Sequence, residues 1–230
     1  MAPDDESTPA AEPGSRDAVV DLLGALAYGE LTAFSRLAGD AELAPSLRDK
    51  VALAQVAAVE LRHYEQLAER IGELGGDPHD AMAPFVAPVD AFHDRTAPND
   101  WLEGLVKAYV GDGVAMDFYR EVAAYVDTDT RALVETVLAD QGHTDVVAAA
   151  VRGAVERDAR LAGRLALWAR RLVGEALSQA QRVAVDRDGL AGLLVGTETA
   201  PGADLAEIGR MFARIMERHG ERMARLGLAP

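Results

Sequence analysis

An acid-x-x-His pair, Glu60 and His63, interrupts the apolar face of a long helical pattern. Apolar residues recur every three or four positions between Leu53 and Ile71, and the pair occupies two of these inward positions. A carboxylate that is buried without a partner is strongly unfavourable, because it loses its hydration. The pair therefore predicts a compensating group inside the fold, and a metal ion is the first candidate.

Three other helical patterns carry a carboxylate on the inward face in the same way. Glu30 lies on the first pattern and Asp112 on the third. Asp140 lies on the fourth and is followed three residues later by His143, which completes a second acid-x-x-His pair. Residues three apart on a helix are neighbours on its surface, so both side chains of each pair can reach one cation.

These positions form an internal repeat. Glu30 and Asp112 are 82 residues apart, and Glu60 and Asp140 are 80 residues apart. Within each half, the first acid precedes the acid-x-x-His pair by 30 and 28 residues, respectively. The repeat predicts two helical hairpins that face each other across one two-metal site. Its candidate ligands are Glu30, Glu60, His63, Asp112, Asp140 and His143.

Four carboxylates and two imidazoles are oxygen and nitrogen ligands, which suit iron or manganese. Their four negative charges would balance two divalent cations. The alternative is that the acids and histidines form buried ion pairs that hold the helices together, although buried ion pairs stabilise proteins poorly. Asp112 and Asp140 are one methylene shorter than glutamate, so this half of the site is expected either to bind its ion more weakly or to require a closer approach of its helices. Gly111 and Gly113 flank Asp112 and predict close packing or a π-bulge there.

The residues around the predicted ligands allow two readings. Tyr28, Tyr64 and Tyr109 border the ligand layer, where they either line a substrate pocket and carry electrons or simply pack. Asp117 lies one position off the inward face of its helix. It is expected to face solvent or to accept a hydrogen bond from a ligand histidine.

The helical patterns predict an all-α fold. Residues 1–14 are rich in Pro, Asp and Glu and are expected to form a disordered acidic tail. Residues 15–155 are expected to form a four-helix bundle, and residues 156–230 two additional helices that pack on it within the same domain. The proline-rich stretch 76–98 is expected to be the long crossover of the bundle and not a continuous helix. Its two histidines, His79 and His93, are expected to be solvated.

Composition excludes several classes of function. The chain has no cysteine, which rules out disulfides, thiolate metal sites and cysteine nucleophiles. Its start has no basic and apolar signal pattern, and no apolar run approaches membrane-spanning length, so the cytoplasm is the expected location. The net charge is −15, with −18 in residues 1–150 and +3 in residues 151–230. This balance disfavours loose binding to nucleic acid, and the arginine-bearing C-terminal part still allows a local anionic contact.

The motifs Y28-G29-E30, E60-L-R-H63, G111-D112 and D140-Q-G-H143 resemble the ferritin-like di-iron carboxylate superfamily. The acidic tail, the proline-rich crossover and the two extra C-terminal helices look like the actinobacterial ferritin-like proteins grouped with tRNA isopentenyl-adenosine hydroxylases. The resemblance implies a ferritin-like bundle with two iron ions, or manganese, held by the six candidate ligands. It also implies an O2-activating oxidase or hydroxylase with an unknown substrate, and an electron donor protein if the reaction is a hydroxylation.

Other functions remain open at this point. The protein is alternatively a ferroxidase, another iron-handling protein or a peroxide-detoxifying ferritin-like protein. It is also alternatively a non-catalytic bundle. tRNA is a conceivable partner that the acidic charge disfavours, and no membrane partner is expected. An apolar face on one of the two C-terminal helices is compatible with a homodimer.

Overall fold

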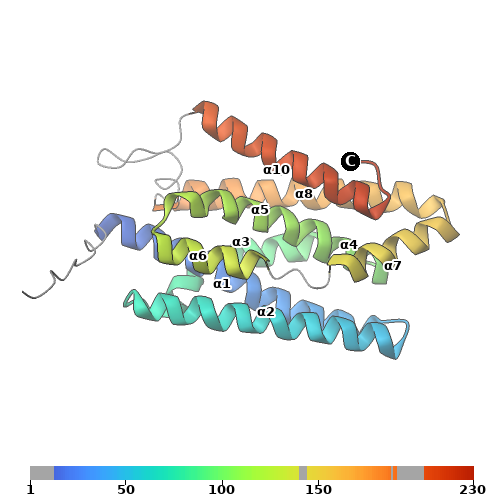
Figure 1. The fold of residues 1–230 in the computed structure, drawn as a ribbon, viewed down its shortest axis with the longest axis horizontal. Helices are drawn as coiled ribbons and strands as arrows, with labels where there is room; N and C mark the ends of the chain where they lie inside the picture. Colours follow the sequence, from blue (N-terminus) through green and yellow to red (C-terminus); the bar gives the residue numbers. More distant parts are fainter. Residues whose placement is uncertain (1–12, 140–143, 188, 191–204) are drawn as a thin grey trace, which may run out of the picture.

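The computed structural model describes residues 13–139, 144–187, 189–190 and 205–230. Within these ranges the chain is helical and contains no strand, which confirms the all-α prediction (Figure 1). Residues 1–12, which make up most of the predicted tail, lie outside the described ranges.

The first two long helices form an antiparallel hairpin. Helix α1 spans Pro13–Asp40 and begins two residues before the predicted start. A short 3-10 turn, η1 (Ala41–Leu43), leads to α2, which spans Leu47–Glu73. The Ser46 hydroxyl caps α2 by accepting a hydrogen bond from the Asp49 backbone N–H. Helix α1 packs more extensively against α2 than against any other described element.

The prediction that residues 76–98 contain no continuous helix is wrong. Helix α3 spans Pro78–Arg95 and includes Pro84 and Pro88. Pro78 stands in its first turn, where a missing N–H costs nothing. The two inner prolines leave the carbonyls of Asp80 and Pro84 without helical donors, and both residues are exposed, so water can satisfy these carbonyls.

The buried face of α3 also corrects the expectation for one of its histidines. His93 is only 7% exposed, and Ala81, Met82 and Phe85 on the same helix are buried as well. Helix α3 packs on α1 and on α8 (Arg160–Asp186). Because the segment is helical, His93 is placed on its inward face, whereas a loop would have left it in solvent.

The third predicted helix is continuous but changes from α-helical to π-helical geometry over a short segment. Helix α4 (Trp101–Val106) is followed by the π-helical segment η2 (Lys107–Gly111) and then by α5 (Asp112–Val122). Asp100 caps α4 by accepting a hydrogen bond from the Glu103 backbone N–H. The π segment ends next to Asp112, which confirms the predicted π-bulge at this site.

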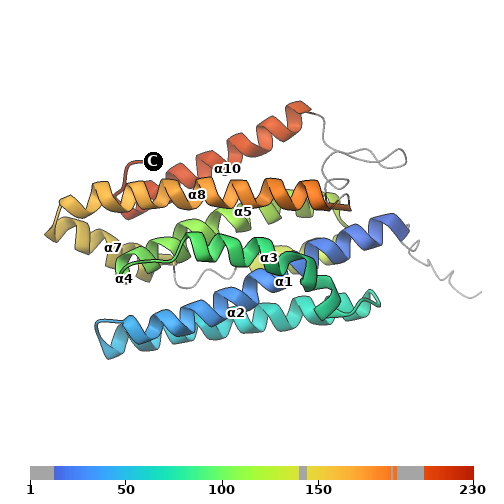
Figure 2. The same ribbon diagram turned by 180° about the vertical axis from the view of Figure 1, so that it is seen from behind.

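The rest of the chain completes the bundle and covers one side of it. The fourth predicted helix is described in two parts, α6 (Thr128–Ala139) and α7 (Thr144–Arg157), with a short 3-10 turn η3 (Ala123–Tyr125) before α6. Helix α10 (Leu205–Leu226) follows α8 and packs on α5 and α7. Figure 1 shows the α1–α2 hairpin on one side of the molecule and α8 with α10 on the other, and Figure 2 shows α3 between α1 and α8.

The apolar core falls into three clusters. The largest joins α4, η2, α5 and α7 to α8 and α10, and includes Val110, Leu172 and Met223. A second joins α1, α2, α3 and α6. A third, smaller cluster lies at the other end of the α1–α2 hairpin and consists of Leu37, Ala41, Leu53 and Ala57. The α1–α2 hairpin therefore has apolar packing at two levels along its length, with the polar positions between them.

Helix α1 is also the one described helix that is long and apolar enough to cross a membrane, judged by length and composition over Arg16–Leu43. Half of its most apolar stretch is buried within the protein. Leu22, Leu23 and Leu26 are at most 1% exposed and belong to the second core cluster. A core helix of a soluble protein has the same length and composition.

The contact of α1 with α3 generates a stability prediction. A Cβ atom on Gly24 would lie 2.2 Å from the Ala81 carbonyl oxygen, so Gly24→Ala must separate the two helices. We expect the free energy of unfolding to fall by about 1–3 kcal/mol, the usual cost of overpacking. Gly174→Ala on α8, where a Cβ would meet no atom within 4 Å, is the matched control and should raise it by up to ~1 kcal/mol. Equal urea-unfolding midpoints for the two variants would contradict the close contact.

Candidate metal centre

Three of the predicted ligands meet inside the α1–α2 hairpin. Glu30 comes from α1, and Glu60 and His63 come from α2. One donor atom of each lies within 4.8 Å of the donor atoms of the other two. His63 Nδ1 is 3.5 Å from Glu30 Oε2 and 3.5 Å from Glu60 Oε2. All three side chains are buried, with residue exposures of 6%, 3% and 4%, respectively.

The local sequence explains why these side chains point inward. On α1, Leu26 and Leu37 are buried on either side of Glu30, and on α2, Leu53 and Leu67 are buried on either side of the acid-x-x-His pair. Each polar residue thus continues the apolar face of its own helix. The hairpin packing that buries the leucines buries the carboxylates with them, so their ionisation is set by the protein and not by water.

The electrostatics of the cluster show competition between burial and pairing. Burial and the neighbouring Glu60 together raise the pKa of Glu30 to about 8, against the opposing effect of His63. Burial alone would lower the pKa of His63, but Glu30 and Glu60 outweigh it and raise this pKa to about 10. The metal-free cluster therefore holds protons at neutral pH where a metal ion would otherwise supply positive charge.

Asp112 is not one of the three grouped residues, but it lies close enough for the charge of Glu60 to act on its pKa. Burial raises its pKa to about 8, and the charge of Glu60 acts in the same direction. It begins α5 immediately after the π segment η2, whose wider turn changes the direction in which the following side chains leave the helix. The second predicted acid-x-x-His pair, Asp140 and His143, lies outside the described residues.

The three tyrosines predicted to border the ligands are in different surroundings. Tyr28 donates a hydrogen bond to Asp90 Oδ1 at 2.9 Å, and Tyr64 packs against the second core cluster. Tyr109 is 5% exposed. A fourth, Tyr119, was not predicted as a site residue, but burial and the charge of Glu30 raise its pKa to about 12. Its place on the inward face of the third helical pattern was the available signal.

The expectation that Asp117 faces solvent is wrong. Its residue exposure is 2%. It accepts hydrogen bonds from Arg120 Nη1 at 2.8 Å and from Arg222 Nη2 on α10, and it is 3.7 Å from Arg218 Nη1. No histidine is among its described hydrogen-bond donors. Sequence reasoning missed this contact because nothing in the pattern of the third helix shows that α10 covers it.

A buried cation also escaped sequence reasoning. Lys107 in η2 is 7% exposed, and its ammonium donates to the Thr96 carbonyl at 2.8 Å and lies 5.5 Å from the centre of the Phe92 ring. Burial and the charge of Arg36 lower its pKa to about 8, against the opposing effect of Asp112. Lys107 thus supplies positive charge on the Asp112 side of the centre.

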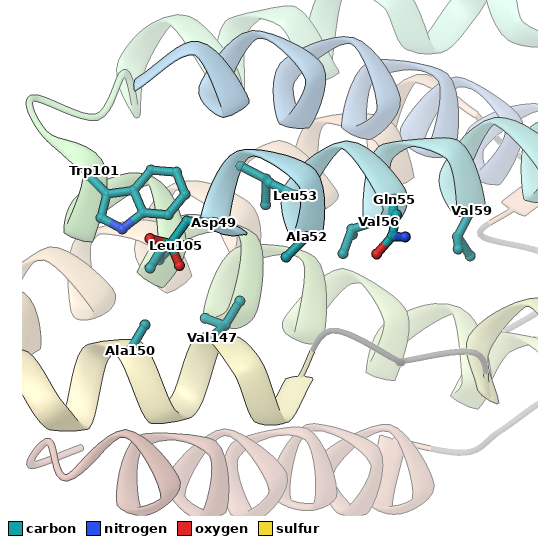
Figure 3. Close-up of a pocket in the computed structure, with 10 residues that line it drawn as sticks. All are labelled: Asp49, Ala52, Leu53, Gln55, Val56, Val59, Trp101, Leu105, Val147 and Ala150. Carbon is teal, nitrogen blue, oxygen red and sulfur yellow. The ribbon is translucent and has the colours of Figure 1, made fainter. Parts of the chain in front are cut away.

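An apolar hollow of about 240 Å³ lies along α2, and none of the metal-ligand candidates lines it (Figure 3). It ends at Val59, the residue before Glu60, and contains one charged side chain, Asp49. Its walls come from α2, α4 and α7, and the residues shown are Asp49, Ala52, Leu53, Gln55, Val56, Val59, Trp101, Leu105, Val147 and Ala150.

The donor set of the hairpin fits a metal ion. Glu30 Oε2 is fully buried and has no hydrogen-bond partner among the described residues. It lies together with a second carboxylate and an imidazole nitrogen, the oxygen and nitrogen donors that iron and manganese take. A cation among these three atoms would remove the repulsion between the carboxylates, which is now relieved by protons.

Metal binding should depend strongly on pH. The pKa values of Glu30 (about 8) and His63 (about 10) both lie above 7, so both groups are protonated at neutral pH and must lose protons to bind a metal. We expect Mn²⁺ binding to release protons and its affinity to rise from pH 6 to pH 8, by about tenfold per pH unit for each proton released. Calorimetry in buffers of different ionisation enthalpy measures the release. A pH-independent affinity without proton release would contradict this assignment.

The variant Glu30→Gln separates a metal site from a structural ion pair. Because Glu30 is mostly protonated at pH 7, we expect the metal-free variant to unfold within about 1 kcal/mol of the parent, while losing most of the stabilisation that Mn²⁺ gives the parent. A buried ion pair that holds the hairpin together would instead cost about 3–5 kcal/mol when broken. Urea unfolding with and without Mn²⁺ distinguishes the two.

Comparison with known proteins agrees with this architecture. A search of curated proteins finds no match to the chain. The family described as the ferritin-like domain of actinomycetes matches residues 14–197, which is most of the chain and includes both helical hairpins and α8. The chain is therefore a member of this actinomycete family of ferritin-like domains.

Proposed function

We propose that the protein is a non-haem di-iron carboxylate protein that uses O2 to oxidise or hydroxylate a substrate. The observation that carries the proposal is the buried group of Glu30, Glu60 and His63, whose donor atoms lie within 4.8 Å of one another inside a ferritin-like bundle. Two buried acids and a histidine on facing helices are unfavourable without a cation, and a redox-active metal gives them a use.

The residues divide into two groups in this proposal. Glu30, Glu60 and His63 would hold one iron, and Asp112, with Asp140 and His143, would hold the other. When bound, the iron pair supplies the electrons and the coordination that O2 needs to react. The protein's part is to keep the centre dry, because Leu26, Leu37 and Leu67 surround the hairpin ligands with apolar packing.

Other side chains support the same chemistry. Tyr119 is close enough to Glu30 for that charge to raise its pKa, so it is placed to hold its proton beside the centre. The apolar hollow along α2 suits a small apolar molecule such as O2, since it holds a single charged side chain (Figure 3). If the reaction is a hydroxylation, we propose that its electrons come from a separate donor protein.

Anaerobic reconstitution with ferrous iron tests the proposal. We expect about two irons per chain, and rapid O2 uptake with a new near-ultraviolet absorbance when air is admitted. Glu60→Gln and His63→Ala should each lower the iron content by about one per chain and slow O2 uptake at least tenfold. Glu65→Gln, an exposed acid on the same helix, is the matched control and should behave as the parent.

Two outcomes would contradict this function. Iron content well below one per chain in the parent would favour a non-catalytic bundle. Assembly into a hollow shell of many subunits, seen by light scattering, would favour iron storage. A monomer or dimer that binds two irons and consumes O2 supports the oxidase or hydroxylase assignment.

A further inference from the structure

A polar pocket of about 310 Å³ is lined by Asp112 and by other residues of η2, α5, α6 and α10. Four of its side chains are arginines, Arg120, Arg218, Arg222 and Arg225, and three are carboxylates, Asp112, Asp117 and Glu221. This surplus of arginine is unusual in a chain with a net charge of −15. Its volume is at the lower end of the range for small-molecule sites.

Three of these arginines, Arg218, Arg222 and Arg225, belong to a row of arginines on α10 that faces a row of acids on α5; we call this arrangement the ladder. On α10 they recur every three or four residues, so Arg214, Arg218, Arg222 and Arg225 share one face. On α5 the facing positions, spaced by four, are Glu121, Asp117 and Gly113. Glu121 pairs with Arg214 at 2.7 Å and with Arg218 at 3.0 Å, and Asp117 pairs with Arg222. The acidic series stops at Gly113, while the arginine series continues to Arg225.

Gly113 lies where the row of ion pairs between α5 and α10 ends and the pocket begins. A Cβ atom at this position would lie 2.8 Å from both Cδ and Nε of Arg222, so only glycine lets this side chain lie against α5. No carboxylate stands there to neutralise the outer end of the ladder. Within the described part of the chain, Arg225 has no ion-pair partner.

Two hydrogen-bond donors in the pocket wall also lack acceptors. Arg222 Nε and the Tyr109 hydroxyl are both buried, and neither has a hydrogen-bond partner among the described residues. Tyr109 is 5% exposed, so water does not freely solvate its hydroxyl group. Both residues line the pocket, and a buried donor without an acceptor calls for an explanation, of which a bound molecule is one.

We propose that this pocket binds the terminal oxyanion group, a carboxylate or a phosphate, of a small-molecule substrate. Arg222 and Arg225 hold the anion, and Tyr109 donates its hydroxyl hydrogen bond deeper in the same pocket, towards Asp112. Guanidinium groups bind both oxyanions through paired hydrogen bonds. The role of the anion as a substrate rests on the proposed function, whereas its binding does not.

Titration of the metal-free full-length protein tests the site. Inorganic phosphate and acetate are added separately, and the Nε–Hε NMR signal of Arg222, assigned from its absence in Arg222→Gln, reports binding. We expect saturable shifts with at least one probe, and the tighter probe identifies the oxyanion that the site prefers. A lack of saturable shift with either probe, relative to sodium chloride at equal ionic strength, would overturn the proposal.

Variants locate the binding by calorimetry. Arg222→Gln and Arg225→Gln should each weaken binding by about tenfold or more, because hydrogen bonds to charged groups contribute at least roughly that factor. Arg210→Gln removes the same charge from the same helix outside the pocket and should leave the affinity unchanged. An equal loss in Arg210→Gln would overturn the proposal, since the effect would then be general screening.

Arg222→Gln removes a hydrogen-bond partner of the buried Asp117 and could for that reason fail to fold. Two less disruptive variants test the pocket in that case. Tyr109→Phe removes only the hydroxyl group, and Gly113→Ala retains all the arginines but displaces Arg222. Both should fold and weaken the binding several-fold. Unchanged affinity in both would exclude the pocket. Because these titrations contain no iron, a failure to bind anions is independent of a failure to bind iron or consume O2.

Discussion

The burial of two carboxylates in the α1–α2 hairpin is the constraint on which the rest of the site depends. Glu30 and Glu60 occupy positions that leucines would fill in an ordinary hairpin, and His63 lies 3.5 Å from an oxygen of each. Without a metal, the cluster remains in the core only because protons replace a cation, as the raised pKa values of Glu30 and His63 show. The apolar packing on both sides provides the free energy that keeps these groups out of water.

The same requirement explains the irregular third helix. A regular helix from Trp101 to Val122 would give one apolar stripe. The π segment η2 immediately precedes Asp112, whose pKa is raised by burial and by the charge of Glu60 and which also lines the arginine pocket. A π turn is less stable than an α turn, and such turns occur often at functional sites. Asp112 is thus the residue that connects the candidate metal centre with the candidate anion pocket.

Helix α10 forms part of the lining of the candidate anion pocket. Helix α10 brings an arginine series against an acidic series on α5, and the buried Asp117 accepts hydrogen bonds from arginines of both helices. The acids of α5 neutralise most of the arginine charge of α10, but no acid stands at the Gly113 position to neutralise the last arginines. An acidic protein thereby has a local basic pocket beside its polar core, where low dielectric strengthens each hydrogen bond to an anion.

Periodicity in the sequence alone determined the all-α class and the inward direction of Glu30, Glu60 and His63, because helix geometry fixes which residues share a face. The glycines beside Asp112 indicated close packing or a π-bulge, and the structure contains the π segment. Sequence reasoning failed where the outcome depended on contacts between distant segments. Pro84 and Pro88 were compatible with a helix because α3 leaves the affected carbonyls in solvent. Asp117 and His93 are buried because α10 and α3 pack where no local pattern shows it. Only the tertiary structure could decide these positions, since burial depends on which helix covers a residue and not on the residue's own neighbours in sequence.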